Sequence, residues 1–308
     1  MPSEAMRLSV IVCTHNPRPD YLDRCLAALR AQSLAAERWE LLVIDNVCDP
    51  PLAPRLQLDW HVDARILRED VLGLTPARLR GIREAAGELL VFVDDDNVLA
   101  SDYLERALRV AAEKPFLGAW SGACEPEFDA PPPAWLRRYW GHMALRQVDH
   151  DLWSNSARSP ETLPCGAGLC VRRDVAGRYL MLNLTGKRSF QLDRAGQSLV
   201  SGGDQDLAAC ACDLGYGVGV IAALRLTHLI PAGRLTLEYQ ARLAEGIYFS
   251  AVILAFLRGS QHEVEGYRVR WTHVARALLA QGPHRRIQFA CLAGRRRGLA
   301  QVDRMARA

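Results

Sequence analysis

Short apolar runs alternate with amphipathic segments in the N-terminal third of the chain. Residues 8–13, 39–44 and 89–93 are almost continuously apolar and rich in β-branched side chains, which is typical of buried strands. Residues 21–32 and 75–85 instead place their apolar side chains at helical spacing. Strands and helices in this order form βαβ units whose strands run parallel. The sequence therefore predicts an α/β fold.

Three adjacent carboxylates follow the third of these strands. The run 89–93 ends at Asp94, Asp95 and Asp96, so these acids lie at the carboxyl edge of a strand. In an open α/β sheet that edge borders the ligand-binding crevice. Adjacent carboxylates repel one another unless a cation holds them, so a divalent metal that carries a phosphate ligand is a natural partner. An acidic turn that caps the helix expected near Ser101 is the competing interpretation.

Polar side chains also follow the first two strands. The turn Thr14-His15-Asn16 comes after the first strand, and Asp45 comes after the second. Because parallel strands deliver their carboxyl ends to one edge of the sheet, the turn and Asp45 should face the same crevice as the acidic triplet.

The regular alternation stops after Pro115. Asp204 and Asp206 begin a predicted helix, where the helix dipole favours carboxylates even without any chemistry. His228 follows a predicted strand at residues 218–223, and a lone histidine in such a place is commonly an ordinary hydrogen-bonded residue. Structural and chemical roles therefore both stay open for these side chains.

The composition is that of a globular protein. The chain has 308 residues, 49% hydrophobic and 24% charged, which fits one large domain or a domain with an appendage. The longest apolar run, Ile247–Leu257, is shorter than the roughly 18 residues that a membrane-spanning helix needs. The start Met1-Pro2-Ser3-Glu4 lacks the basic and apolar regions of a secretory signal. We therefore expect a cytoplasmic protein.

The nine cysteines are expected to be buried and reduced, because their number is odd and most lie in apolar segments. A zinc site is the alternative for four of them, although their spacing fits paired zinc knuckles poorly. These four are Cys165, Cys170, Cys210 and Cys212.

The positive charge is concentrated at the C-terminal end. Residues 258–308 contain eleven arginines and three acids, a net charge of +8, whereas the whole chain carries +3. Trp271, Val274, Leu278 and Leu279 lie at helical spacing among these arginines. Such a segment can lie on the inner face of an anionic membrane, and a solvated face or an oligomer contact are the alternatives. Nucleic acid is not an expected partner.

Six segments in this order resemble the family 2 glycosyltransferases of the GT-A fold, over about three quarters of the chain. The resemblance implies a mixed, mostly parallel sheet with flanking helices. The segments are Ser9-Val10-Ile11-Val12-Cys13-Thr14-His15-Asn16, Val43-Ile44-Asp45-Asn46, Gly73-Leu74-Thr75-Pro76-Ala77-Arg78-Leu79-Arg80-Gly81, Val93-Asp94-Asp95-Asp96-Asn97, Gly203-Asp204-Gln205-Asp206-Leu207 and His228-Leu229-Ile230-Pro231.

The resemblance assigns a donor site. The turn Thr14-His15-Asn16 and Asp45 would hold the base and ribose of a nucleotide-sugar, and Asp94 would lie near the ribose. Arg78 and Asp95 complete the residues expected to contact the donor.

The resemblance also assigns a metal site and a general base. Asp96 would bind Mn²⁺ or Mg²⁺ that bridges the diphosphate, and His228 would complete the metal site. Asp204 matches the acid that serves as general base in inverting members of the family. The cation would neutralise the leaving diphosphate, and the carboxylate would accept the proton of the acceptor hydroxyl.

Two positions depart from the family pattern. Gly203 stands before Asp204, where the family usually has Glu, so an acidic partner is missing unless Asp206 replaces it. His15 stands where Tyr is frequent, which bears on base stacking and on the choice of nucleotide.

These assignments divide the sequence into segments. Residues 1–233 form the expected GT-A domain, with a nucleotide-binding half at 1–115 and an acceptor-binding half at 116–233. Residues 234–308 form a basic helical extension. Acceptor recognition is expected within residues 120–164, where the resemblance is weakest.

We therefore expect a metal-dependent inverting glycosyltransferase that moves a sugar from a UDP-sugar to a hydroxyl of a surface glycan, a glycolipid or a secondary metabolite. Two alternatives stay open: a protein that binds nucleotide-sugars without turnover, and a sugar-phosphate nucleotidyltransferase. The latter would carry a Gly-rich basic loop after the first strand, where this chain has Thr14-His15-Asn16-Pro17. The oligomeric state is open.

Overall fold

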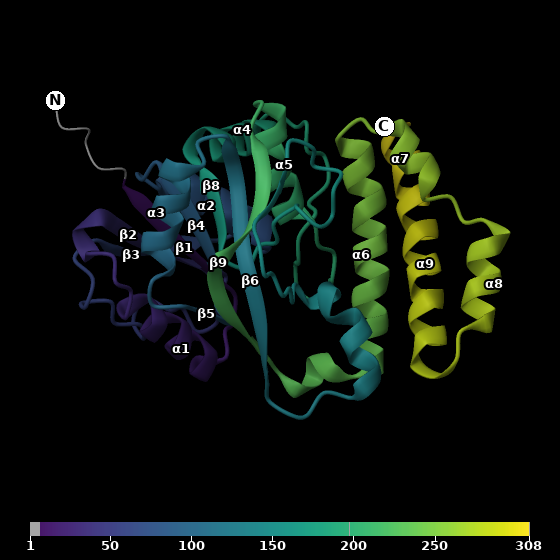
Figure 1. The fold of residues 1–308 in the computed structure, drawn as a ribbon, viewed down its shortest axis with the longest axis horizontal. Helices are drawn as coiled ribbons and strands as arrows, with labels where there is room; N and C mark the ends of the chain where they lie inside the picture. Colours follow the sequence, from purple (N-terminus) through teal and green to yellow (C-terminus); the bar gives the residue numbers. More distant parts are fainter. Residues whose placement is uncertain (1–6, 197, 308) are drawn as a thin grey trace. The chain divides into compact units, whose positions relative to one another are not determined.

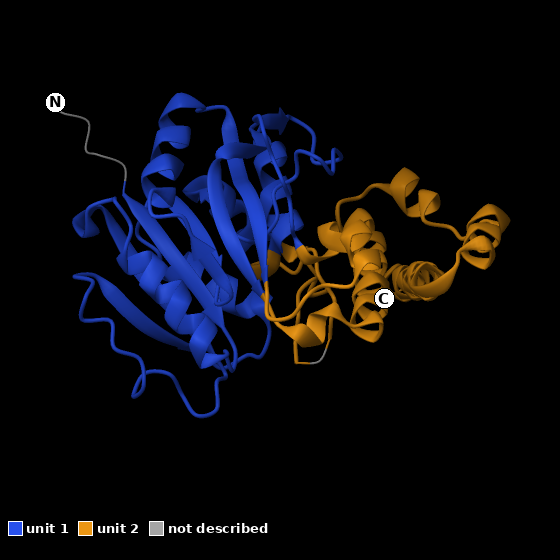
Figure 2. Ribbon diagram, turned by 60° about the horizontal axis from the view of Figure 1, so that its bottom comes forward, with its two compact units in different colours: residues 1–127, 144–182, 204–229 blue, residues 128–143, 183–203, 230–308 orange. Residues whose placement is uncertain are grey.

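A computed structural model describes residues 7–196 and 198–307 (Figure 1). These residues pack as two compact units, each assembled from separate stretches of sequence (Figure 2). The predicted division at residue 233 is a division of the sequence and stays a prediction. Unit 1 comprises residues 1–127, 144–182 and 204–229, and unit 2 comprises residues 128–143, 183–203 and 230–308.

Unit 1 is built on a mixed sheet, which is the predicted fold class. Its strands, over the described part of the chain, are β1 (Leu8–Thr14), β2 (Trp39–Asn46), β3 (Ala64–Glu69), β4 (Leu89–Asp94), β5 (Asn97–Leu99), β6 (Leu117–Phe128), β7 (Leu152–Ser154), β8 (Leu169–Arg172) and β9 (Gly217–Ile230). They are arranged in the order β3-β2-β1-β4-β8-β6-β9-β5, with β7 paired to β9. Strands β3, β2, β1 and β4 run parallel, whereas β8, β5 and β7 make antiparallel pairs.

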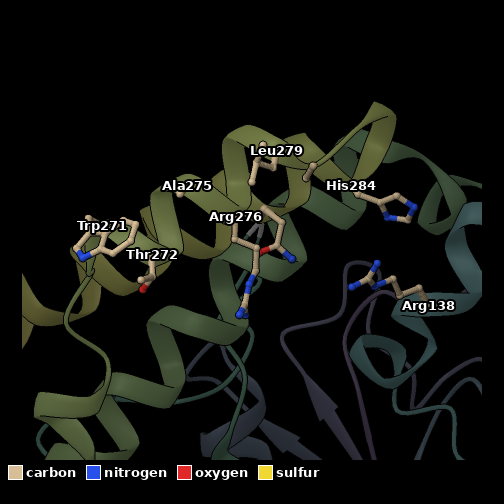
Figure 3. A pocket seen from close by; sticks show the side chains of 9 residues that line it. Arg138, Trp271, Thr272, Ala275, Arg276, Leu279 and His284 are labelled. Atoms are coloured by element: carbon tan, nitrogen blue, oxygen red, sulfur yellow. The ribbon is translucent and has the colours of Figure 1, made fainter.

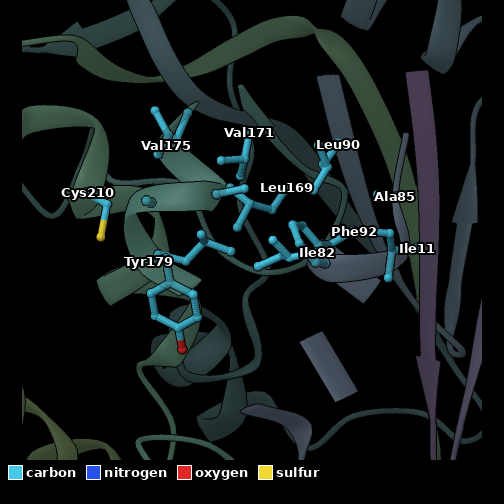
Figure 4. Close-up of a cluster of buried hydrophobic side chains, with 14 of the residues drawn as sticks. Ile11, Ile82, Ala85, Leu90, Phe92, Leu169, Val171, Val175, Tyr179 and Cys210 are labelled. Atoms are coloured by element: carbon cyan, nitrogen blue, oxygen red, sulfur yellow. The ribbon is translucent and has the colours of Figure 1, made fainter. Parts of the chain in front are cut away.

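Helices flank this sheet and supply half of its core. They are α1 (Pro19–Arg30), the short 3-10 helix η1 (Ala36–Arg38), α2 (Leu74–Glu84), α3 (Tyr103–Glu113), α4 (Arg173–Leu184) and α5 (Gly203–Asp213). One cluster of buried side chains joins Ile11 and Phe92 from the strands to Ile82 of α2 and Val175 of α4 (Figure 4). A Cβ on Gly81 would lie 2.4 Å from Cγ2 of Ile11, so glycine lets α2 pack closely on β1.

Unit 2 contains the predicted C-terminal helices. Its elements are η2 (Ala134–Met143), η3 (Ala232–Leu235), α6 (Leu237–Leu257), α7 (Gln261–Gly266), α8 (Trp271–Leu279) and α9 (Gly282–Met305). Helices α6 and α9 pack along each other. A Cβ on Gly294 would lie 2.2 Å from the carbonyl oxygen of Glu245, and one on Gly298 would lie 2.7 Å from Cβ of Val252. The two glycines therefore permit a close approach of the helix backbones.

Helix α6 is long and apolar enough to cross a membrane, judged by length and composition alone. Half of its most apolar window is buried inside the protein, where Ala244, Val252 and Ile253 are fully enclosed. The core helix of a water-soluble protein has the same length and composition, and the packing of α6 against α9 is of this kind.

All nine cysteines are free thiols, and seven of them are buried. Burial raises the pKa of the thiol for Cys25, Cys124 and Cys170, because the charged thiolate would lose its hydration. These thiols therefore stay protonated and unreactive at neutral pH.

Candidate active site

The carboxyl ends of three parallel strands bring the N-terminal site residues to one edge of the sheet. Thr14 of β1 lies opposite Asp45 of β2, and Cys13 lies opposite Asp94 of β4. The hydroxyl of Thr14 donates a hydrogen bond to the carboxylate of Asp95. The turn after β1, the end of β2 and the start of the acidic triplet thus form one continuous polar edge.

Asp45 is buried and engaged by the chain itself. Its two oxygens accept hydrogen bonds from the backbone N–H groups of Cys48 and Leu52, each at 2.9 Å. Oδ1 also accepts a hydrogen bond from Nη1 of Arg68 at 2.8 Å. Burial alone would raise the pKa of Asp45, but these donors outweigh it and hold the pKa below the ordinary value. Asp45 therefore fixes the loop that follows β2, and contact with a nucleotide stays a prediction for it.

His15 and Asn16 are exposed and held by the same loop. Nδ1 of His15 lies 2.7 Å from the carbonyl oxygen of Asn46. Asn16 has a positive φ of 47°, and its side-chain oxygen accepts the backbone N–H of Asp49 at 2.8 Å. The ring of His15 is thus anchored through one nitrogen, which gives it a defined orientation at the mouth of the edge.

Asp96 and His228 lie together although 132 positions separate them in the sequence. The antiparallel pairing of β5 with β9 sets Asn97 opposite His228, and the N–H of Leu229 donates to the carbonyl oxygen of Asp96 at 2.8 Å. As a result Nε2 of His228 lies 3.3 Å from Oδ2 of Asp96, with each residue 7% exposed.

The pair fits a divalent cation as part of its coordination sphere. A carboxylate oxygen and an imidazole nitrogen about 3 Å apart can share one ion, since each ligand would stand about 2.1 Å from it. The neighbouring Asn97 donates to Oδ1 of Asp96 at 3.0 Å, and in the described residues its buried amide oxygen has no hydrogen-bond partner. Among residues 7–196 and 198–307 no three His, Cys, Asp or Glu side chains form a metal cluster, so further ligands would come from elsewhere.

Asp204 stands at the start of α5 with a well-defined orientation. Its Oδ2 accepts the N–H of Gly166 at 2.7 Å, and Oδ1 accepts the N–H of Gln205 at 2.9 Å. A Cβ on Gly166 would lie 3.2 Å from Oδ2 of Asp204 and 2.9 Å from Nη2 of the buried Arg78. Gly166 therefore lets Asp204 and Arg78 approach the same point.

Two thiols of unit 1, those of Cys124 and Cys165, have raised pKa values. The pKa of Cys124 is raised first by burial and then by the charges of Cys165, Asp96 and Asp94. The pKa of Cys165 is likewise raised by burial, with a contribution from Asp204.

A side chain at position 203, where the family pattern has glutamate, would have to displace the carboxylate of Asp193. In unit 2 a Cβ on Gly203 would lie 2.1 Å from Oδ2 of the buried Asp193. Asp193 could not be recognised from the sequence, because it lies in an irregular stretch without periodic spacing. Asp206, the residue expected to replace that glutamate, is buried in the first turn of α5.

Comparisons with known proteins show which family the chain resembles. Residues 9–158 match the model of glycosyl transferase family 2. The succinoglycan biosynthesis protein ExoM of Rhizobium meliloti is 28% identical over 60% of this chain and 58% of its own length. An N-acetylglucosaminyltransferase of Bradyrhizobium elkanii is 29% identical over 37% of this chain and 64% of its own length.

Solved structures show the same fold. The mannosyltransferase PcManGT from Pyrobaculum calidifontis, in complex with GDP-Man and Mn²⁺, superposes with a TM-score of 0.59 at 17% identity. That match covers 97% of this chain and 89% of the neighbour, whereas the first curated relatives are matched over about a third to two thirds of their length. Residues 9–158 therefore match glycosyltransferase family 2, and the chain has the GT-A fold.

Proposed function

We propose that this chain transfers a sugar from a nucleotide-sugar, expected to be UDP-linked, to an acceptor hydroxyl, with inversion at the anomeric carbon. The observation that supports this most strongly is the buried pair of Asp96 and His228, because the fold brings two metal-ligating side chains together at the ligand-binding edge. The sugar-transferase names of the relatives favour this activity over the nucleotidyltransferase alternative.

Asp96 and His228 would hold the divalent cation, Mn²⁺ or Mg²⁺. Bound there, the cation would supply positive charge to the leaving diphosphate. The neighbour PcManGT, whose structure contains GDP-Man and Mn²⁺, supports this assignment. Two buried protein ligands leave coordination positions for phosphate oxygens and water, as is usual for Mg²⁺-type sites that carry nucleotides.

The polar edge around β1, β2 and β4 would hold the donor. The turn Thr14-His15-Asn16 and the loop fixed by Asp45 lie where the base and ribose are expected. Asp94 and Asp95 continue that edge toward the diphosphate, and Thr14 orients Asp95. Because these groups are already hydrogen-bonded, the site is largely formed before the donor binds.

Asp204 would act as general base. As the acceptor oxygen attacks the anomeric carbon, its proton passes to the carboxylate of Asp204 and the bond from the anomeric carbon to the diphosphate oxygen breaks. The N–H groups of Gly166 and Gln205 fix the carboxylate, and the guanidinium of Arg78 approaches the same glycine, Gly166. Such proton transfer contributes about 10²- to 10⁴-fold in rate.

The acceptor would be recognised by residues 116–233, and residues 120–164 are the first candidates within them. A surface glycan, a glycolipid or a secondary metabolite would each present a suitable hydroxyl. The sugar transfer would take place in the cytoplasm or at the inner face of the membrane.

Purified protein incubated with a panel of UDP- and GDP-sugars, with and without Mn²⁺, tests this function. Release of nucleoside diphosphate that requires Mn²⁺ is the expected result. Donor binding without turnover would instead support the nucleotide-sugar-binding alternative. Synthesis of a nucleotide-sugar from a nucleoside triphosphate and a sugar phosphate would contradict the proposal.

A further inference from the structure

Helix α8 presents an apolar face to solvent. Trp271 and Leu279 are 80% and 81% exposed, the two highest values among the large hydrophobic side chains of the described residues. Leu278 beside them is also exposed, whereas Ala277 on the opposite side of the helix is fully buried. Helix α8 therefore packs against α9 through one face and leaves its apolar outer face uncovered.

A groove of about 470 Å³ lies beside this face within unit 2. Its volume falls in the range of about 300–1,000 Å³ that small-molecule sites occupy. Apolar and basic side chains line it together (Figure 3). The apolar ones are Trp271, Ala275, Leu279 and Ala280, and the basic ones are Arg138, Arg276 and His284.

The guanidinium groups of the groove are not neutralised by acids. Arg138 and Arg276 are exposed, and no carboxylate of residues 7–196 or 198–307 forms an ion pair with either. Arg297 and Arg268, by contrast, pair with Glu245 and Glu265. The positive charge that residues 258–308 carry in the sequence is thus uncompensated at this groove.

We propose that this face docks on an anionic phospholipid surface. The rings and methyl groups of Trp271, Leu278 and Leu279 would enter the interfacial region, and Arg138 and Arg276 would bind lipid phosphates in the groove. The charge argues against a second copy of this chain, because two such basic faces would repel each other. The inference goes beyond the proposed function, and its test needs no sugar transfer.

Co-sedimentation of the full chain with vesicles tests the proposal. Vesicles of phosphatidylcholine with phosphatidylglycerol are compared with vesicles of phosphatidylcholine alone, at about 0.1 M salt. We expect binding to the anionic vesicles only. The variants are Trp271→Ser with Leu279→Ser, and Arg138→Gln with Arg276→Gln.

The variant Trp271→Ser with Leu279→Ser, called the apolar pair variant, is expected to bind the anionic vesicles at least about tenfold more weakly than the unaltered protein. The variant Arg138→Gln with Arg276→Gln is expected to bind about tenfold or more weakly, since each arginine near an anionic surface raises the affinity about fivefold. Matched controls are Val62→Ser, an apolar side chain 73% exposed in unit 1, and Arg30→Gln at the end of α1. Both should bind as the unaltered protein does.

Three results would overturn the proposal. Equal binding to neutral and anionic vesicles, or no binding at all, would show that the protein does not recognise an anionic phospholipid surface. Unchanged binding of the apolar pair variant, with an unchanged melting temperature, would show that the apolar face of α8 does not contact the membrane. A dimer in solution that the apolar pair variant dissociates would show that a second copy covers it.

Discussion

The replacement Gly203→Ala tests the packing in front of the predicted base. The new Cβ would lie 2.1 Å from Oδ2 of Asp193 and 2.5 Å from its Cγ. An ordinary contact needs about 3.4 Å or more, so the buried carboxylate must move by more than about 1 Å. Overpacking of this kind costs about 1–3 kcal/mol. We therefore expect a lower melting temperature, by about 2 °C or more per kcal/mol.

Thermal unfolding followed by circular dichroism measures the effect, and a second variant isolates its cause. In Asp193→Ala the carboxylate is absent, so adding Gly203→Ala to that background should cost much less than it does alone. Gly177→Ala is the matched control, because a Cβ there meets no atom within 4 Å inside helix α4. It should raise stability slightly.

The same contact predicts the effect of restoring the family's glutamate. Gly203→Glu should lower the stability and fail to raise sugar transfer, since Asp193 already fills the space. If Gly203→Ala were as stable as the unaltered protein, or if the cost were the same with and without Asp193, the steric reasoning would be refuted.

Two further predictions concern the site. Asp204→Asn should retain donor affinity in calorimetry and lose at least about 100-fold in transfer rate, because the amide cannot accept the proton; full turnover would assign the base elsewhere, with Asp206 as the first candidate. Asp45→Asn should destabilise the protein at neutral pH, and the difference should shrink as pH falls below about 4, since a carboxylate whose pKa is lowered in the folded protein stabilises it above the unfolded pKa and loses that effect on protonation. Urea denaturation across pH 3–7 checks this, and a pH-independent difference would contradict it.

The sequence predicted the half of the fold in which local order and spatial order agree. Consecutive βα units allow one parallel arrangement, so Thr14, Asp45 and Asp94 could be placed at one edge from spacing alone. The approach of Asp96 and His228 depends on the antiparallel pairing of strands far apart in the chain, and only the family resemblance suggested that these two residues share a site.

Other features lay outside the reach of sequence patterns. Asp193 belongs to an irregular stretch, where burial leaves no periodic signal. The carboxylate oxygens of Asp45 accept hydrogen bonds from backbone N–H groups of the following loop, and no sequence motif reveals these bonds. The apolar residues of α8 fitted either a buried or an exposed face, and only the three-dimensional structure shows Trp271 and Leu279 in solvent.

The central claim is that Asp96 and His228 form a cation site for the donor diphosphate, and calorimetry of nucleotide binding tests it most directly. UDP and GDP are titrated into the unaltered protein, Asp96→Asn and the exposed control Asp23→Asn, each with Mn²⁺ and with EDTA. Mn²⁺ should raise the affinity of the unaltered protein and of the control by at least about tenfold, and should leave that of Asp96→Asn unchanged. An equal Mn²⁺ enhancement in Asp96→Asn would contradict the account.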